Sequence, residues 1–181
     1  MSNLQPIDVS VIVTCRDQQA QLHQLLPLLF SQQYVGEFEV IVVDMLHDKD
    51  VEEWLEELRV HHPNLSHTFC PVSSRGIDIN KLAFTLGAKA ANYDWLVFLS
   101  AGIGTINNDF LTRLTANCDD SVDVLVGDER HKPRYRWPSF GIRYHKLSIY
   151  QPQSSFIVCR RSILLQEDPN IPEDRIIRLP L

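Results

Sequence analysis

The sequence predicts an α/β fold in which a mostly parallel sheet is flanked by helices, and two observations predict it. Between Val9 and Leu99, short apolar runs that suit strands buried on both faces alternate four times with stretches of helical composition or apolar spacing. Hydrophobic residues make up 44% and charged residues 22% of the 181-residue chain, which is ordinary for a globular protein that buries a core. We therefore expect one domain that spans residues 1–181.

The first strand and the first helix follow from adjoining patterns. Val9–Val13 is short, β-branched and nearly continuous, as in a strand buried in a parallel sheet. From Gln18 to Phe30, four leucines recur at the spacing of one helix face. Pro27 lies inside this stretch, and we expect it to kink the helix or to end its regular hydrogen bonding.

The elements up to the fourth strand repeat this alternation. Phe38–Val43 is a second buried-type strand, and Asp50–Val60 carries an apolar stripe on one helical face. His67–Pro71 is a short third strand, Ile79–Ala91 is helical by composition, and Trp95–Leu99 is the fourth strand. This half, residues 8–116, has the alternating order expected of a Rossmann-like, mostly parallel sheet.

The rest of the chain, residues 117–181, differs from this half because its apolar runs are fewer and a charged stretch containing aromatic residues and proline interrupts them. A helix beginning at Asp109–Leu111 precedes this part. The predicted elements of the part are, in order, a strand at Val122–Val126, a surface loop at Asp128–Gly141, a strand at Ser155–Cys159, a short helix opening at Arg160–Ser162, and an irregular or edge segment at Ile171–Leu181.

Charge and cysteine usage exclude several classes of protein. A formal charge of −6 argues against a nucleic-acid binder, although basic residues cluster between Arg130 and Arg136. No two of the four cysteines are closely spaced, so we expect free thiols in a reducing cytoplasm. The N-terminus lacks the basic and apolar regions of an export signal, and no apolar run approaches the ~20 residues that span a bilayer.

Three groups of residues lie where predicted strands end. They are Thr14–Asp17 after the first strand, Asp44 after the second and Ser100–Gly102 after the fourth. Because ligands of open α/β sheets bind beyond the carboxyl ends of the strands, we expect these groups to converge on one crevice. No P-loop, dinucleotide fingerprint or metal-binding histidine pattern occurs in the sequence.

Four segments, in the right order and at suitable spacing, resemble family 2 glycosyltransferases, which have the GT-A fold. The segments are Val9–Asp17, Phe38–Asp44, Asn80–Ala91 running into Phe98–Gly102, and Phe156–Ser162. The resemblance implies an opening strand and nucleotide-contacting turn, a second strand whose terminal acid meets base or ribose, a turn at the donor diphosphate, and a strand-to-helix element on the acceptor side. It also divides the domain into a nucleotide-binding half, 8–116, and a shortened acceptor-side half, 117–181.

The resemblance assigns candidate nucleotide contacts residue by residue, and each has a structural alternative. The candidates are Thr14, Cys15, Arg16, Asp17, Asp44, Lys81, Ser100, Ala101 and Gly102. Asp44 is favoured as a ligand but is also a residue type that caps the following turn. Lys81 faces the diphosphate or is a solvated helix residue, and Arg16 meets phosphate or forms a surface salt bridge.

The turn after the fourth strand departs from the family pattern. Family members carry Asp-x-Asp there, whose carboxylates hold Mg²⁺ or Mn²⁺ against the diphosphate, whereas this chain has Ser100 and Gly102. Ser100 offers one neutral oxygen and Gly102 only its backbone. We therefore expect no metal site and no certain cofactor, and activity that is impaired or absent.

The family's catalytic base is an acid late in the domain, and Glu173–Asp174 stands in that order. Asp174 is therefore the candidate base, with a charged surface tail as the alternative.

The first functional hypothesis is a glycosyltransferase of polysaccharide biosynthesis that moves a sugar from a UDP-type donor to a glycan or lipid acceptor. It would be cytoplasmic, or peripheral at the inner membrane surface. The second is a non-catalytic relative, a pseudoenzyme that binds within a glycan-synthesis complex, and the third is an unrelated doubly wound nucleotide-binding domain.

Overall fold

The computed structural model describes residues 6–71, 78–128, 156–165 and 175–180. Its elements are β1 (Val9–Cys15), α1 (Gln19–Phe30), β2 (Phe38–Asp44), α2 (Lys49–Arg59), β3 (Leu65–Phe69), α3 (Ile79–Ala90), β4 (Trp95–Ser100), the 3₁₀ turn η1 (Ala101–Ile103), α4 (Phe110–Thr115), β5 (Val124–Asp128), β6 (Phe156–Arg160), α5 (Arg161–Leu164) and β7 (Ile176–Pro180).

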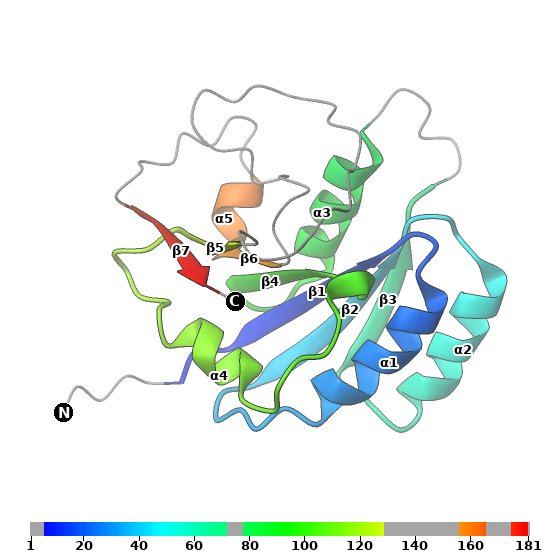
Figure 1. The fold of residues 1–181 in the computed structure, drawn as a ribbon. Coiled ribbons are helices and arrows are strands. Elements are labelled where there is room, and N and C mark those ends of the chain that lie inside the picture. Colours follow the sequence, from blue (N-terminus) through cyan, green and yellow to red (C-terminus); the bar gives the residue numbers. More distant parts are fainter. Residues whose placement is uncertain (1–5, 72–77, 129–155, 166–174, 181) are drawn as a thin grey trace.

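A single seven-stranded sheet organises the fold, with strand order β3-β2-β1-β4-β6-β5-β7 (Figure 1). The pairs β3–β2, β2–β1, β1–β4 and β5–β7 are parallel, and β6 runs antiparallel to both of its neighbours. The predicted α/β class with a mostly parallel sheet is confirmed. The segment predicted as irregular or edge provides the edge strand β7.

Element boundaries differ from the predictions in a few places. The third strand begins at Leu65 rather than at His67, and β5 begins at Val124 rather than at Val122. Helix α1 continues past Pro27 to Phe30, and Ser31 N donates to Pro27 O at 3.1 Å. The predicted loop from 128 to 141 falls almost wholly outside the described residues.

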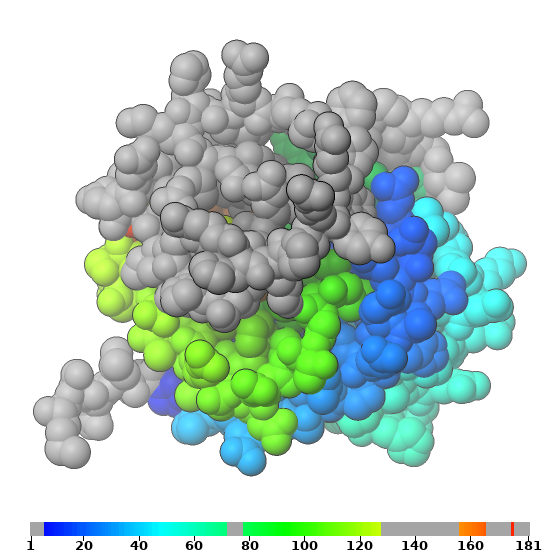
Figure 2. All heavy atoms as spheres, viewed as in Figure 1, coloured from blue at the N-terminus to red at the C-terminus, as the bar shows by residue number. Residues whose placement is uncertain are grey.

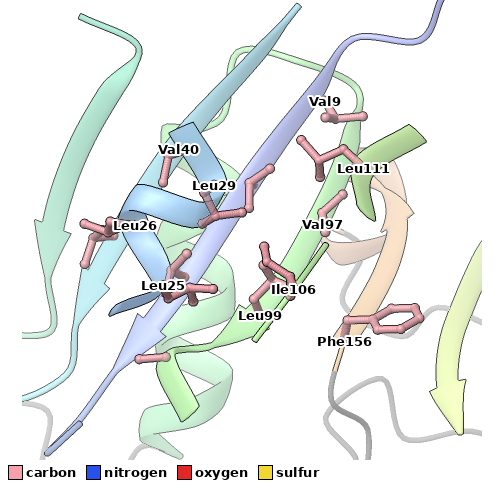
Figure 3. Packing of buried hydrophobic residues seen from close by; sticks show 14 of the residues in the cluster. Val9, Leu25, Leu26, Leu29, Val40, Val97, Leu99, Ile106, Leu111 and Phe156 are labelled. Atoms are coloured by element: carbon pink, nitrogen blue, oxygen red, sulfur yellow. The ribbon is translucent and has the colours of Figure 1, made fainter. Parts of the chain in front are cut away.

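Two hydrophobic layers cover the two faces of the sheet. Helices α1, α2 and α4 pack on one face, and α3 and α5 pack on the other. Figure 3 shows the first layer, where leucines of α1 and α4 meet valines of the strands. Alternate residues of β1 serve the two layers: Val11 and Val13 face α1, and Ile12 faces α3. Burial on both faces explains why the strands are continuously apolar.

The four cysteines are buried free thiols, as predicted. Burial raises the pKa of Cys118 to about 12 and raises that of Cys159 further, so both are neutral thiols at physiological pH. Among the residues that the structure describes, no helix has the length and apolar content needed to cross a bilayer.

Helix α3 approaches β1 most closely at Gly87. A Cβ added at Gly87 would lie 2.5 Å from Cγ2 of Ile12, a side chain buried in the sheet. Cγ2 is fixed next to the backbone, so it cannot move away as the end of a flexible side chain would. The missing side chain therefore sets the distance between α3 and the strand.

Replacing Gly87 with alanine is expected to lower the free energy of unfolding by about 1–3 kcal/mol, because the added methyl group overpacks the contact with Ile12. Urea unfolding measures the change. Helix propensity alone predicts the opposite sign, since alanine favours helix over glycine by about 1 kcal/mol. Ala90→Gly, at an exposed position of the same helix, isolates that effect. A more stable Gly87→Ala variant would show that the contact is not tight.

Candidate functional site

The carboxyl ends of β1, β2 and β4 lie side by side at one edge of the sheet, which we call the carboxyl edge. In the paired register, Cys15 of β1 stands opposite Asp44 of β2, and Thr14 stands opposite Ser100 of β4. Because β1 lies between its two partners, Asp44 and Ser100 are two strand spacings apart, about 10 Å. One bound nucleotide could reach both positions.

The turn from β1 to α1 presents two charged side chains at this edge. Arg16 and Asp17 are exposed, and neither forms an ion pair within the described residues. Thr14 is half-buried and its Oγ1 donates to Leu99 O at 3.4 Å. Cys15 is buried, and burial raises the pKa of its thiol. Arg16 and Asp17 are therefore free to meet a ligand, whereas Cys15 packs in the core.

The carboxylate of Asp44 caps the turn that follows β2. It accepts the backbone N–H of Leu46 at 2.9 Å and that of Asp48 at 2.5 Å, one at each oxygen. The side chain is 5% exposed. The capping role that the sequence left open for Asp44 is therefore present in the structure, and a ligand at Asp44 would share oxygens that already accept hydrogen bonds.

The same turn carries an aromatic pair that the sequence did not indicate. His47 has a left-handed backbone (φ 55°), and its ring stacks on Phe69 with centroids 3.7 Å apart and an interplanar angle of 2°. Phe69 ends β3 and is the register partner of Asp44. Non-glycine residues at positive φ are uncommon and merit inspection. The pair extends the carboxyl edge beyond β2.

The turn after β4 is closed by neutral groups. Ser100 Oγ accepts the N–H of Gly102 at 3.3 Å and donates to Oε1 of Gln18 at 3.2 Å. A Cβ added at Gly102 would lie 2.9 Å from Gln18 Nε2. Ala101 is buried beneath the turn. Gln18, which the sequence did not indicate, therefore lies over the two positions that carry aspartates in the glycosyltransferases that the sequence resembles.

Lys81 lies in the first turn of α3. Asn92, just after this helix, bonds Glu39 at the amino end of β2, so the start of α3 lies toward the carboxyl edge. The backbone N–H of Lys81 is capped by Asp78 at 3.3 Å. Its side chain is half-buried and forms no ion pair within the described part of the chain.

Hydrogen bonds hold the segment after η1 against the end of α1. Gln32 Nε2 donates to Asn107 O at 2.7 Å, and its Oε1 accepts the N–H of Leu111 at 3.0 Å. Thr112 Oγ1 adds a bond to Gln33 O at 2.9 Å. Figure 2 shows the two segments, blue and green, in contact on one face of the molecule. These bonds keep the segment that leaves the Ser100–Gly102 turn against α1.

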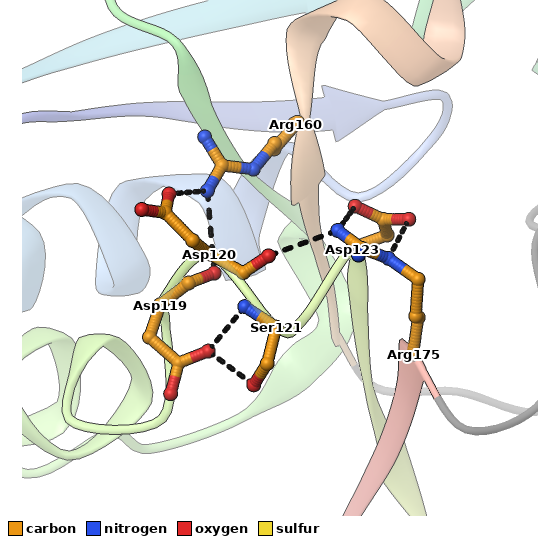
Figure 4. Close-up of polar contacts among 6 residues, drawn as sticks. All are labelled: Asp119, Asp120, Ser121, Asp123, Arg160 and Arg175. Atoms are coloured by element: carbon orange, nitrogen blue, oxygen red, sulfur yellow. Dashed lines mark hydrogen bonds and ion pairs between the residues drawn. The ribbon is translucent and has the colours of Figure 1, made fainter.

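A second polar cluster lies at the opposite, amino edge of the sheet (Figure 4). Arg175 pairs with both carboxylate oxygens of Asp123 at 2.6 and 2.7 Å, just before β5 and β7 begin. Arg160 donates to Asp120 at 2.9 Å and lies 4.6 Å from the ring centroid of Trp95, the first residue of β4. The cluster ties the last strand to the sheet at the end of β4 remote from Ser100.

The location of this cluster bears on two expectations from the sequence. Asp174 lies outside the described residues, and its neighbour Arg175 is at the amino edge. Because β6 is antiparallel to β4, Phe156 stands opposite Leu99 beside the carboxyl edge, whereas Arg160 stands opposite Trp95. The strand-to-helix element expected on the acceptor side therefore approaches the candidate site only through its first residue.

The residues at the Ser100–Gly102 turn do not fit a divalent cation. Mg²⁺ in such sites is held by one or two carboxylates together with substrate phosphates. Here the turn offers a hydroxyl, a backbone and an amide, and no group of three or more His, Cys, Asp or Glu side chains in the described residues could hold a metal ion.

No protein-family profile matches the sequence, and no curated protein matches it. Solved structures do match. Residues 1–349 of TarS from S. aureus, in complex with UDP-GlcNAc, superpose with a TM-score of 0.63 and 23% identity, covering 96% of this chain and 56% of that one.

Two further solved structures also match the fold of this chain. Glucosyl-3-phosphoglycerate synthase from Mycobacterium tuberculosis, in complex with Mn²⁺, UDP and glucosyl-3-phosphoglycerate, gives a TM-score of 0.61 at 16% identity over 98% of this chain and 70% of that one. 4-Diphosphocytidyl-2C-methyl-D-erythritol synthase from Anaerococcus prevotii gives 0.60 at 10% identity over 96% and 87%. The chain spans little more than half of the matched TarS structure, 56%. At these identities the likeness establishes architecture, and the architecture is the GT-A glycosyltransferase fold.

Proposed function

We propose that this protein is a divergent family 2 glycosyltransferase that binds a UDP-type nucleotide-sugar at the carboxyl edge of β1, β2 and β4. The observation that carries the proposal is the register of that edge, which brings the β1–α1 turn, Asp44 and the Ser100–Gly102 turn together. It is supported by the glycosyltransferases among the structural neighbours, which include structures in complex with UDP-GlcNAc and with UDP.

In this proposal the nucleotide lies across the ends of the three strands. The base or ribose is on the β2 side, next to Asp44 and the His47–Phe69 stack. The diphosphate is on the β4 side, over Ser100, Ala101 and Gly102. Arg16 supplies a free guanidinium, whose fork suits phosphate. Lys81 supplies a point charge from α3. The sugar acceptor, a glycan or a lipid, is a further part of the proposal.

A second candidate function, a non-catalytic binding or assembly module for glycan synthesis, is favoured by the neutral turn after β4. Sugar transfer needs stabilisation of the departing diphosphate, and the turn carries no carboxylate to hold a cation there. Such a module would keep nucleotide binding and lose transfer. A nucleotide-binding experiment therefore tests both candidates, and a measurement of turnover distinguishes them.

Titration calorimetry with UDP tests the shared part of the proposal. We expect UDP to bind with equal affinity in EDTA and in Mn²⁺, because the residues at the turn do not fit a cation. Asp44→Asn is expected to weaken UDP at least about tenfold, the usual cost of a lost hydrogen bond to a charged group. Asp50→Asn, in the first turn of α2, is the control of equal charge change.

Two results would contradict this expectation. Tightening of UDP binding by Mn²⁺ over orders of magnitude would mean that other acids form a metal site. Failure of UDP to bind in either buffer would remove the nucleotide-binding proposal altogether. Melting temperatures of both variants show whether Asp44→Asn acts through the turn that its carboxylate caps.

A further inference from the structure

We propose that the side-chain amide of Gln18 is a diphosphate-contacting group of this protein, acting at the turn where relatives of this fold would place a metal ion. This inference rests on the proposed function, because it names a further residue for the same nucleotide site. Three observations on Gln18 carry it: where its amide lies, which of its atoms are already engaged, and which role its side chain does not fill.

The amide lies directly over the turn. Ser100 Oγ donates to Gln18 Oε1 at 3.2 Å, a contact between residues 82 positions apart in the chain. The Nε2 atom is 2.9 Å from the place where a side chain at Gly102 would begin. The amide nitrogen therefore fills space that an aspartate at position 102 would need for its own side chain.

The hydrogen bonding leaves the donor end of the amide available. Oε1 is engaged by Ser100, and Nε2 donates to no acceptor in the described residues. A primary amide has two N–H donors at that nitrogen. Since the nitrogen is at the turn and the side chain is half-exposed, the two N–H groups can meet phosphate oxygens.

Helix capping does not explain the position of this side chain. Gln18 is the N-cap residue of α1, yet its side chain makes no capping hydrogen bond. Ser, Thr, Asp and Asn are the residues that cap helices well, and glutamine is not among them. The side chain instead crosses to β4. A neutral donor there stabilises an anion without the charge of a cation, in agreement with nucleotide binding that does not depend on metal.

Calorimetry with two ligands tests this role. UDP carries the diphosphate and uridine does not, so an effect on UDP alone identifies a phosphate contact. We expect Gln18→Ala to weaken UDP binding in EDTA about tenfold, as for one hydrogen bond to a charged group, and to leave uridine unchanged. Gln18→Glu keeps the shape and replaces the donor by a carboxylate, so it should weaken UDP further in EDTA. With Mn²⁺, Gln18→Glu should recover affinity.

Gln21→Glu is the matched control, because Gln21 is exposed on the first turn of the same helix and the change in charge is identical. The inference is overturned if Gln18→Ala and Gln18→Glu bind UDP in EDTA as the unmodified chain does, or if uridine weakens equally. Those outcomes would leave the nucleotide site in place. Absence of both UDP and uridine binding to the unmodified chain would instead overturn the proposed function and this inference together.

Discussion

Placing aspartate at both Ser100 and Gly102 is expected to create metal-dependent nucleotide binding, and to do so fully only when Gln18 is also replaced by alanine. The reason is steric and electrostatic together. Gln18 Nε2 lies 2.9 Å from the position of a Cβ at residue 102, so an aspartate there must shift the end of this flexible side chain, and the amide N–H groups can then donate to the new carboxylates in competition with a cation. Gly102 has no positive φ, so its backbone accepts a side chain.

The expected effects of Mn²⁺ on UDP affinity follow from the number of carboxylates at the turn. With two carboxylates and free space, Mn²⁺ should tighten UDP binding to the triple variant about a hundredfold, equivalent to about 3 kcal/mol. In the double variant that retains Gln18, Mn²⁺ should tighten UDP binding less. The control replaces the same positions with asparagine, in the presence of Gln18→Ala, to match size without charge. Calorimetry in EDTA and in Mn²⁺ gives each value. If the double and triple variants respond equally to Mn²⁺, then Gln18 does not obstruct the turn.

The carboxyl edge could be predicted because its signals are local. Asp44 and Ser100 each follow an apolar run, and buried runs of that kind identify parallel strands whose ends share an edge. The sequence therefore indicates which residues lie at the carboxyl edge, although it does not give their geometry. The alternative roles of Asp44 could not be separated in the same way, because capping depends on which N–H groups the turn directs at the carboxylate.

The contacts that the sequence did not predict join distant segments. Gln18 and Ser100 are 82 positions apart, and a glutamine at a helix start carries no distinctive pattern. The stacking of His47 on Phe69 depends on a left-handed residue and on the register of β3, whose predicted start was displaced by two residues. The direction of β6 also had no local signal, because an antiparallel strand buried on both faces is as apolar as a parallel one.

The sequence neighbour of the candidate base Asp174 belongs to the amino-edge cluster. Asp174 was selected by its order in the chain, after the strand-to-helix element at Phe156–Ser162. Its neighbour Arg175 is ion-paired to Asp123 near the start of β5, at the amino edge. The length of β4 separates that edge from Ser100, about 17 Å at the usual rise of a strand. Asp174 itself lies outside the described residues, and its role as the catalytic base stays a prediction.

The unmodified protein is accordingly expected to transfer sugar slowly or not at all. Losing one preorganised group that stabilises a leaving group typically lowers the rate by about 10²–10³. The turn beneath the proposed diphosphate site has no carboxylate that would bind a cation, and the amide of Gln18 has hydrogen-bond donors but no full charge. Release of UDP from a panel of UDP-sugars, followed under single-turnover conditions with and without Mn²⁺, measures the rate.

Asp174→Asn separates the remaining explanations. A catalytic base must be held close to the acceptor, since small displacements of a catalytic group cost large factors in rate. If transfer is absent, or slow and independent of residue 174, Asp174→Asn and the control Asp168→Asn should give the same rate as the unmodified chain. Rapid turnover that Asp174→Asn abolishes and Asp168→Asn preserves would show instead that the protein is an active enzyme, with Asp174 as its base. The geometry at Arg175 makes the first result the expected one, because its backbone and its ion pair with Asp123 both lie at the amino edge.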